Sequence, residues 1–498
     1  MAGVRRGRRT VRSGSLGRFA AGWAVVSALA LAIPGTAQQS AARPNIVVVL
    51  VDDWRWDEYG AAGHAFLETP SINRMAAEGV SFSRAYHATP LCSPNRASLL
   101  TGQYASRHGI RDNVAKDLTS HRLPTFPQAI QRLGYETAFI GKWHMGNDPT
   151  PRPGFDTWIA LPGQGRTVDP ELYEDGRLHT VEGYVTDLLT DRAVDFITED
   201  RDRPFLLYLS HKAVHPDARQ LNDGSVDPNY PSRFIAAERH TDRYVDAEVE
   251  FAPSRLTGTD LPEGKPAVRS ALEHKWSRPE TDAARVLAQK PRDVAARTRA
   301  EMLLSVDESL GRLLTTLEAE DILDETVVVF TSDNGYYYGE HGLTAERRMP
   351  YEAGVRSPLL IRYPALARPG TTIDRLAVSV DLAPTAIDLA GGTPGSHIQG
   401  RSWVPLLRGE TEGWRDSVLM EYFSHERPFA WMLDMSYKVV RTDRYKLIRW
   451  LQQDGVDELY DVEADPYEMR NLIDDPAHAE TVAELRDELA RLVGEVTR

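Results

Sequence analysis

The sequence predicts an α/β fold: a large, mostly parallel (mixed) sheet sandwiched by helices, followed by a smaller C-terminal α+β domain with a short antiparallel sheet. Two observations predict this architecture. Short apolar, β-branched runs alternate with helical patterns from about residue 43 to residue 410. Beyond residue 410, short strand patterns follow one another without helices between them, and one helical pattern ends the chain. We therefore expect a larger domain over residues 43–410 and a smaller one over residues 411–498.

Four of the apolar runs end in polar side chains, as buried parallel strands do where they run into loops. The runs are PNIVVVLVDD, YETAFIGKWHMG, PFLLYLSHKAVH and TVVVFTSDNG, and the polar side chains at their ends are Asp52, Asp53, Lys142, His144, His215, Asp333 and Asn334. Ligands of α/β sheets bind beyond the carboxyl ends of the strands. We therefore expect these side chains to converge on one site. Lys142 and His144 are two residues apart, so both face the same side if their segment is extended.

Helical patterns lie between the runs, in SINRMAAEGV, in FPQAIQRLG and across residues 292–323. The C-terminal part predicts antiparallel strands in WRDSVLMEYF, SYKVVRTDRYKLIRW and DELYDVEADP, and a helix over residues 478–493. Residues 216–290 are rich in Pro, Asp, Arg and Gly and have weak periodicity, so we interpret them as a long insertion. This segment either overhangs and shapes the site or decorates the surface.

The N-terminal segment differs in composition from the rest of the chain. A basic stretch with RRGRR comes first, then a mostly apolar stretch from Ala20 to Ile33, then PGTAQQS. This order is typical of a secretory signal peptide, which we place at residues 1–37. The apolar stretch is shorter than the roughly 20 residues that span a membrane, and a retained anchor is the alternative. We expect export to the periplasm or the extracellular space, with no membrane span after cleavage; Arg8 and Arg9 leave the export route open.

Composition and charge narrow the classes of function. With 498 residues, 42% of them hydrophobic, the chain can bury a large core. Its 58 basic and 72 acidic residues give a formal net charge of -14, which opposes binding to nucleic acid. An anionic substrate therefore needs a local basic pocket.

Cys92 is the single cysteine of the chain, so no internal disulfide can form. Such a cysteine is either a small buried hydrophobe or a group with chemistry of its own. It is the second residue of LCSPNRASLLTG, which predicts a helix with Pro94 in its first turn. The backbone N–H groups and the dipole at this end of a helix lower a cysteine's pKa or hold an anion, and Arg96 adds a permanent positive charge.

The block CSPNRASLLTG resembles the hallmark of the formylglycine-dependent (type I) sulfatases, a family of the alkaline phosphatase superfamily. PNIVVVLVDD, GKWHMG, SHKAVHP, TSDNG with GEHGL, and ELYDVEADPYEMRNL are similar to further segments of that family, so the resemblance spans nearly the whole mature chain. It implies that a dedicated maturation enzyme oxidises Cys92 to formylglycine.

Asp52, Asp53, Asp333 and Asn334 offer three carboxylates and an amide, which are hard oxygen ligands suited to Ca²⁺ or Mg²⁺. An adjacent Asp pair on its own is commonly a cap or a turn. The resemblance implies that these positions and the modified Cys92 bind one divalent cation, with Ca²⁺ favoured over Mg²⁺. The charge of that cation offsets the negative charge that builds at sulfur.

The resemblance also implies roles for the basic side chains. Lys142 would bind the sulfate and the formylglycine, and His144 would take the proton that lets the sulfated intermediate collapse. His215 would bind the sulfate and assist the leaving alcohol. We interpret His211 as structural.

Arg347 stands where the family usually has a second sulfate-binding lysine, four residues before the tyrosine of a Y-E pair. Arginine keeps the charge and binds sulfate through its planar fork. It cannot easily donate a proton, because its pKa is above about 12. The general-acid role therefore moves toward His215.

The resemblance therefore implies hydrolysis of sulfate esters through a formylglycine hydrate and a sulfated-enzyme intermediate. Asp333 would draw the proton from the attacking hydroxyl, while Arg96, Lys142 and Arg347 stabilise the developing charge. One alternative is a phosphonate or phosphate monoester hydrolase on the same scaffold. Another is a non-catalytic protein that binds sulfated glycans and keeps Cys92 unmodified.

GEHGL and ELYDVEADPYE look most like sulfatases that act on sulfated sugars, including glycosaminoglycans and algal polysaccharides. We therefore predict exo action on fragments of such carbohydrates. The predicted substrate-binding residues are Lys142, His215, Arg347 and Asn113, and further candidates for sugar contacts are His108, Gln164, Tyr336 and His425.

Overall fold

The computed structural model describes residues 43–227, 229–277, 292–344, 347–424, 432 and 434–497. The predicted signal peptide lies outside the described residues, as do His425 and residues 278–291 at the end of the predicted insertion. Within the described part of the chain, no helix combines the length and the apolar character that crossing a membrane requires.

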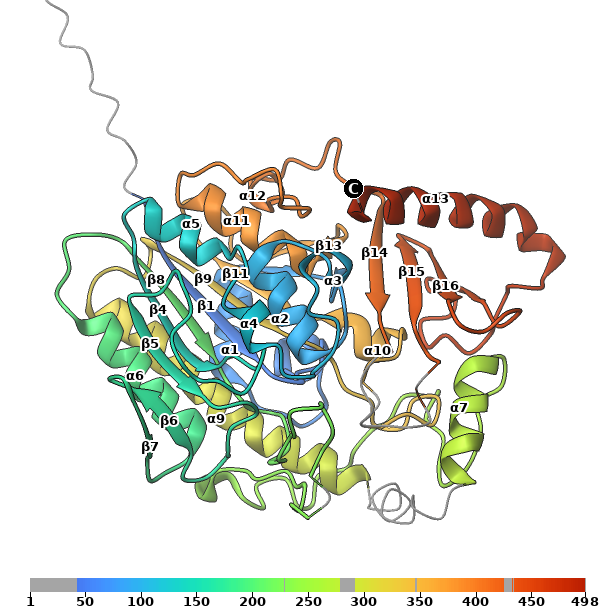
Figure 1. Ribbon diagram of the computed structural model, residues 1–498, viewed down its shortest axis with the longest axis horizontal. Coiled ribbons are helices and arrows are strands. Elements are labelled where there is room, and N and C mark those ends of the chain that lie inside the picture. Colours follow the sequence, from blue (N-terminus) through green and yellow to red (C-terminus); the bar gives the residue numbers. More distant parts are fainter. Residues whose placement is uncertain are drawn as a thin grey trace, which may run out of the picture. The chain divides into compact units, whose positions relative to one another are not determined.

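A large mixed sheet forms the centre of the structure (Figure 1). Among the described residues it has ten strands, in the order β12 (Thr371–Ile373), β2 (Val80–Phe82), β11 (Leu359–Arg362), β9 (Thr326–Ser332), β1 (Asn45–Val51), β8 (Phe205–Ser210), β4 (Glu136–Lys142), β5 (Thr157–Leu161), β6 (Glu171–Glu174) and β7 (Arg177–Thr180). Strands β9, β1, β8, β4 and β5 are parallel to one another. Antiparallel pairing occurs where β11 lies between β2 and β9, and where β6 and β7 follow β5. The predicted fold class is confirmed.

Both faces of the sheet are buried, which explains why β1 is a continuous β-branched run. Alternate residues of β1 point to opposite faces, so Val48 and Leu50 belong to one core and Val47 and Val49 to another. The first core also takes side chains from helices α2 (Cys92–Thr101), α5 (Phe126–Arg132) and α11 (Leu382–Leu389). The second takes them from α1 (Pro70–Glu78), α6 (Val185–Thr198) and α9 (Arg292–Ala319). Helices therefore cover the sheet on both sides, as the alternating pattern predicts.

The C-terminal part forms an antiparallel sheet, also as predicted. Its strands are β14 (Ser417–Tyr422), β15 (Tyr437–Thr442), β16 (Tyr445–Trp450) and β17 (Glu458–Asp461), and helix α13 (Ala479–Thr497) packs on them. These elements share a third hydrophobic core with Tyr86, Tyr337 and Tyr351 of the preceding part. The small sheet therefore packs firmly against the α/β part.

One helix forms where the sequence predicts an irregular insertion. This helix, α7 (Pro266–Trp276), begins with proline in its first turn. It buries Ala267, Val268, Ala271 and Leu272 in the third core. Tertiary packing therefore stabilises a helix that the weak periodicity of the sequence did not predict.

The other described elements are short. They are helices α3 (Ala105–His108), α4 (Asp117–Ser120), α10 (Glu352–Val355) and α12 (Val404–Leu407), and a small sheet of β10 (Arg356–Ser357), β3 (Ala85–Tyr86) and β13 (Ala377–Val378). The 3-10 helices are η1 (Gly60–Ala62), η2 (Glu238–His240), η4 (Ser379–Asp381) and η6 (Pro476–His478).

Candidate active site

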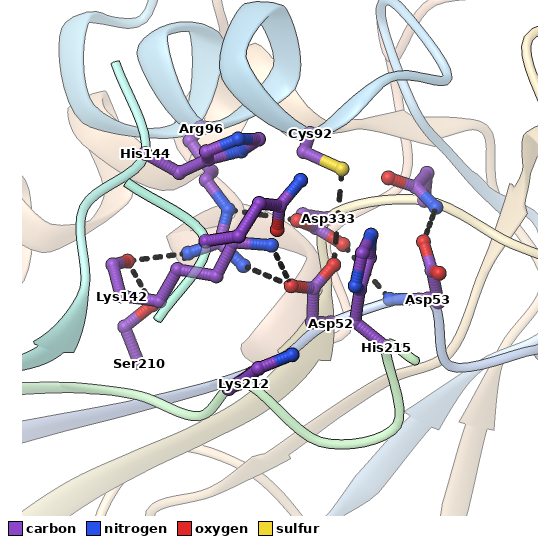
Figure 2. Close-up of polar contacts among 12 residues, drawn as sticks. Asp52, Asp53, Cys92, Arg96, Lys142, His144, Ser210, Lys212, His215 and Asp333 are labelled. Atoms are coloured by element: carbon purple, nitrogen blue, oxygen red, sulfur yellow. Dashed lines mark hydrogen bonds and ion pairs between the residues drawn. The ribbon is translucent and has the colours of Figure 1, made fainter. Parts of the chain in front are cut away.

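The site lies where the neighbouring parallel strands β9, β1, β8 and β4 end (Figure 2). The ends of these strands are in register, since Val51 pairs with Ser332 and Leu50 pairs with Ser210. The polar residues that follow therefore start at one level of the sheet, and they are buried together. The side chains that meet there are Asp52, Asp53, Lys142, His144, His215, Asp333 and Asn334.

Cys92 faces this group from the start of α2. It is the first residue of the helix, after Leu91 in an extended conformation, and its side chain is fully buried. Its Sγ atom lies 3.8 Å from Asp52 Oδ1. Asn113 Oδ1 accepts a hydrogen bond of 3.1 Å from the backbone N–H of Ser93 in the first turn, so this side chain caps the helix beside Cys92. Its predicted contact with substrate stays a prediction.

The unmodified thiol of Cys92 is a poor nucleophile in this environment. Burial, reinforced by the nearby Asp52 carboxylate, raises the pKa of the Cys92 thiol to about 12. The sequence predicts that the helix N-terminus lowers this pKa or holds an anion. The pKa is raised instead, because loss of hydration and the Asp52 charge outweigh the charges of Lys142 and Arg347. The binding of an anion there stays a prediction. A thiol that stays protonated is a weak nucleophile.

The residues present fit a divalent cation. One ligand atom from each of Asp52, Cys92 and Asp333 lies within 4.8 Å of the other two. Two further oxygens, Asp53 Oδ2 and Asn334 Oδ1, are buried and have no hydrogen-bond partner among the described residues. Buried oxygens are rarely left without a partner unless an ion or a water satisfies them. An oxygen-rich set of this kind is typical of Ca²⁺ and Mg²⁺ sites.

The Arg96 guanidinium contacts residues at the ends of several strands of the sheet. Its Nε is 2.7 Å from Asp333 Oδ2, and its Nη1 donates 2.6 Å hydrogen bonds to the Lys142 carbonyl and to Ser210 Oγ. Its Nη2 lies 3.5 Å from Asp52 Oδ2. The guanidinium is 2% exposed, so its charge acts at short range on the three carboxylate and carbonyl groups that it touches.

Lys142 and His144 both reach the site, but not through an extended segment. The Lys142 ammonium forms an ion pair with Asp52. His144 has a backbone φ of 60°, in the left-handed region, so the extended segment that the sequence analysis took as its condition does not form. The turn itself brings the His144 ring toward Cys92 (Figure 2). Burial, and then the charges of Lys142 and Arg96, hold the pKa of His144 well below its usual range, so the ring is neutral.

His215 and Arg347 form a hydrogen-bonded pair at the other side of Cys92. His215 Nδ1 lies 2.7 Å from the Pro216 carbonyl, which can only accept, so Nδ1 carries the proton. Burial and the Lys142 charge hold the pKa of His215 well below its usual range, so Nε2 accepts the 2.8 Å hydrogen bond from Arg347 Nη2. Arg347 Nε lies 2.9 Å from Asp53 Oδ1.

The remaining candidates for sugar contacts lie in different settings. His108 uses both ring nitrogens inside the protein, with Ser98 Oγ at 3.1 Å and the Ile110 N–H at 3.1 Å, so it is not available to a sugar. Gln164 Nε2 donates a hydrogen bond of 3.1 Å to Gln220 Oε1 at the edge of the site. The ring of Tyr336 stacks under the Arg299 guanidinium, with 4.2 Å from Cζ to the ring centre. His211 lies 3.0 Å from Ser309 Oγ, in keeping with its structural interpretation.

Two residues at the site were missed by the sequence reasoning. Lys212 is buried, and its Nζ donates a hydrogen bond of 2.9 Å to the Pro216 carbonyl, which also accepts from His215. Its place in SHKAVH, between His211 and His215, is the signal in the sequence that could have indicated it. Gln220 Oε1 lies 2.6 Å from His144 Nε2. It comes from the segment of weak periodicity, where no pattern marks it.

Known proteins with similar sequences were found over nearly the whole chain. A sulfatase family model matches residues 44–392, and a model of the N-sulphoglucosamine sulphohydrolase C-terminal region matches residues 339–495. The N-acetylglucosamine-6-O-sulfatase of Bacteroides thetaiotaomicron is 32% identical over 503 residues, which cover 92% of this chain and 88% of that protein.

Solved structures have the same architecture. One of them, a complex with its substrate D-glucosamine-2-N,6-O-disulfate, aligns with a TM-score of 0.75 and 29% identity over 91% of this chain and 98% of that chain. The phosphonate monoester hydrolase of Agrobacterium radiobacter aligns with a TM-score of 0.71 and 23% identity over 91% of this chain and 96% of that chain, which is a likeness of fold alone. Since the sulfatase model covers most of the chain, this protein belongs to the sulfatase family and is a sulfuric ester hydrolase.

Proposed function

We propose that this sulfatase removes 6-O-sulfate groups from terminal glucosamine residues of glycosaminoglycan fragments, with residue 92 as the nucleophile in its formylglycine form. The observation that carries the proposal is the position of Cys92, at a helix N-terminus and 3.8 Å from Asp52 Oδ1, inside a buried group of carboxylates and cationic side chains. The sugar is suggested by the similar bacterial N-acetylglucosamine-6-O-sulfatase and by the disulfated glucosamine in the similar complex.

The first half of the reaction transfers the sulfuryl group to residue 92. Asp333 takes the proton of a hydroxyl on the hydrated residue 92, whose oxygen bonds to sulfur as the bond from sulfur to the sugar oxygen breaks. Arg96, Lys142 and Arg347 provide fixed positive charge for the transition state. A bound sulfate ester draws the Arg347 donors to its own oxygens, so His215 Nε2 becomes free to take up a proton from solvent. The negative charge of the ester favours that uptake, and His215 then passes the proton to the leaving sugar oxygen.

The second half releases inorganic sulfate without attack of water on sulfur. His144 takes the proton of the remaining hydroxyl on residue 92, the carbonyl bond of the aldehyde re-forms, and the bond from that carbon to the sulfate oxygen breaks. A neutral His144 suits this step, since its depressed pKa leaves one ring nitrogen able to accept a proton.

Asp52, Asp53, Asp333, Asn334 and residue 92 would hold a Ca²⁺ ion, which supplies positive charge opposite the sulfate oxygens. An ion that binds only the folded state raises the melting temperature. We expect Ca²⁺ to raise the Tm of chelator-treated protein more than Mg²⁺ does at equal concentration, and Asp53→Asn to lose most of this rise. Calorimetric scans that are identical with and without Ca²⁺ would contradict the cation assignment.

We further propose that the chain is exported and that a formylglycine-generating enzyme of its host matures Cys92. The basic and apolar order of the N-terminal segment supports export, and the lone cysteine in the CSPNR block supports maturation.

The substrate is tested with defined compounds. We expect release of sulfate from glucosamine-6-O-sulfate and its N-acetylated or N-sulfated forms, at rates well above those for the 3-O-sulfated or 4-O-sulfated isomers. An aryl phosphonate and an aryl phosphate are assayed in parallel, because phosphonate monoester hydrolases have the same fold. Faster hydrolysis of the phosphonate than of every sulfated sugar would contradict the proposed substrate class.

A further inference from the structure

Gln220 contacts one of the two nitrogens of the His144 ring. His144 Nε2 lies 2.6 Å from the Gln220 side-chain oxygen. The other ring nitrogen, Nδ1, is buried and has no hydrogen-bond partner among the described residues. Nε2 therefore contacts Gln220, while Nδ1 is available to accept a proton in the reaction.

The orientation of the Gln220 amide follows from its other contacts. Its Nε2 donates a 2.8 Å hydrogen bond to the Gly224 carbonyl, which can only accept. Gln164 Nε2 donates to its Oε1 at 3.1 Å. The amide nitrogen must therefore face Gly224 and the amide oxygen must face the histidine. Since that oxygen can only accept, His144 Nε2 carries the proton and Nδ1 holds the lone pair.

The surrounding backbone keeps this geometry in place. Residues 220–226 form a tight loop in which Gln220 pairs with Val226, and the Leu221 N–H donates 2.8 Å to the Ser225 carbonyl. The Asn222 carbonyl accepts a 3.0 Å hydrogen bond from the Ala115 N–H, which fastens the loop to the body of the protein.

The ring is also fixed relative to the nucleophile. The His144 carbonyl accepts a hydrogen bond from Ser93 Oγ, next to Cys92, and the ring points toward Cys92 (Figure 2). His144 is therefore held from both ends, by α2 through its backbone and by the loop through its ring.

We infer that Gln220 is a positioning residue for the second half of the reaction: it holds His144 in the tautomer and ring orientation that present Nδ1 to the hydroxyl of residue 92. This inference rests on the proposed function, in which His144 takes that proton. The segment that the sequence leaves without a pattern then contributes to catalysis through one amide oxygen. Residues that orient a reactive histidine in this way typically contribute about 10- to 100-fold to activity.

The test uses the full-length enzyme with Cys92 converted, and compares Gln220→Leu, Gln220→Glu and His144→Ala. In Gln220→Leu we expect kcat to fall by about 10- to 100-fold with KM nearly unchanged. Because only sulfate release is slowed, each enzyme molecule should release one alcohol in a rapid burst, and the sulfated form of the Cys92 peptide should accumulate in mass spectra. Gln220→Glu keeps an acceptor oxygen, so it should restore most of kcat.

Two controls separate positioning from a general disturbance of the loop. Asn222→Ala removes a side chain of the same loop that does not touch His144, and it should leave the kinetics unchanged. Gln220→Leu combined with His144→Ala should lose no more activity than His144→Ala alone, since the two residues act as a unit.

The outcomes are distinct. Wild-type enzyme that releases no sulfate would overturn both the proposed function and this inference. If His144→Ala accumulates sulfated enzyme but Gln220→Leu keeps the wild-type rate, or slows without a burst and without rescue by Gln220→Glu, the role of Gln220 is wrong and the proposed function stands.

Discussion

Arg347 joins the two halves of the site at the scale of single residues. Its planar fork reaches Asp53 Oδ1 at 2.9 Å through Nε and His215 Nε2 at 2.8 Å through Nη2. A lysine has no second donor at that spacing, so it could make one of these contacts but not both. The arginine therefore links the Asp53 carboxylate to the His215 ring.

Two substitutions of Arg347 distinguish the contribution of its positive charge to activity from that of its planar guanidinium. We expect Arg347→Met to lower kcat/KM for a sulfate ester by about 100- to 1000-fold, because a charge that stabilises the transition state is lost. Arg347→Lys should lose about tenfold or less, because the charge remains while the fork is lost. Steady-state kinetics measure both, with Arg219→Met as a control for loss of one positive charge at an exposed position. An Arg347→Met enzyme as active as the control would contradict this role.

At the scale of elements, helix α1 is capped by a residue of another helix. Thr69 precedes α1 but its side chain makes no capping hydrogen bond. Asp307 of α9 accepts hydrogen bonds from the Ser71 N–H at 3.1 Å and from the Ile72 N–H at 2.8 Å. One buried carboxylate thus satisfies two N–H groups at the start of α1 and fixes the two helices on the same face of the sheet.

We expect Asp307→Ala to lower the free energy of unfolding by about 1–3 kcal/mol, because buried N–H groups lose their acceptor. Asp307→Asn should lose less, since one acceptor oxygen remains. Urea denaturation measures both changes, with Thr315→Ala on the exposed face of α9 as the control. If Asp307→Ala unfolds like the control, the helix cap contributes little.

The sequence predicted elements well where pattern and burial agree. The strands β1, β4, β8 and β9 and the polar residues at their ends follow from apolar runs that stop abruptly. The sequence did not predict local structure that depends on an unusual backbone conformation or on packing against distant residues. The left-handed turn at His144 has no signature in GKWHMG, and α7 is stabilised by a core made of residues far away in the chain. Gln220 reaches His144 only because a loop folds back on the site, which no spacing in the sequence can reveal.

At the scale of the whole molecule, the C-terminal sheet is tied to the rest by buried charges as well as by the third core. Lys446 of β16 lies 2.7 Å from Glu352 and 2.7 Å from Glu468. The sequence predicts the sheet itself from local alternation, but not this junction, because the partner carboxylates lie far from each other in the chain.

Buried histidines make the folded protein sensitive to acid. Burial lowers the pKa of His87 and of His108 to about 3 and that of His211 to about 4. Each stays neutral in the folded state while the unfolded chain takes up a proton below the ordinary histidine pKa of about 6.5. The unfolded state then binds more protons, so stability falls as the pH drops from 7 to 5, by about 2 kcal/mol for each such histidine.

This linkage is tested by the pH dependence of a variant. We expect His108→Gln to lose about 2 kcal/mol less than the wild type between pH 7 and pH 5, since one proton uptake by the unfolded chain is removed. Denaturant unfolding at pH 7 and pH 5 gives the change in the free energy of unfolding for each protein. A loss of stability that the substitution causes equally at both pH values cancels in this comparison. Equal losses in the two proteins would show that His108 is protonated in the folded state.

We propose that residue 92 acts as the nucleophile only after conversion to formylglycine. Burial raises the pKa of its unmodified thiol to about 12, which favours a nucleophile formed by modification of this residue. The most direct test measures the rate of sulfate release against the converted fraction of the Cys92 peptide, determined by mass spectrometry, in preparations with different degrees of maturation. We predict that the rate is proportional to the converted fraction and vanishes when no peptide is converted. Full activity in a preparation whose Cys92 peptide keeps its thiol would contradict it.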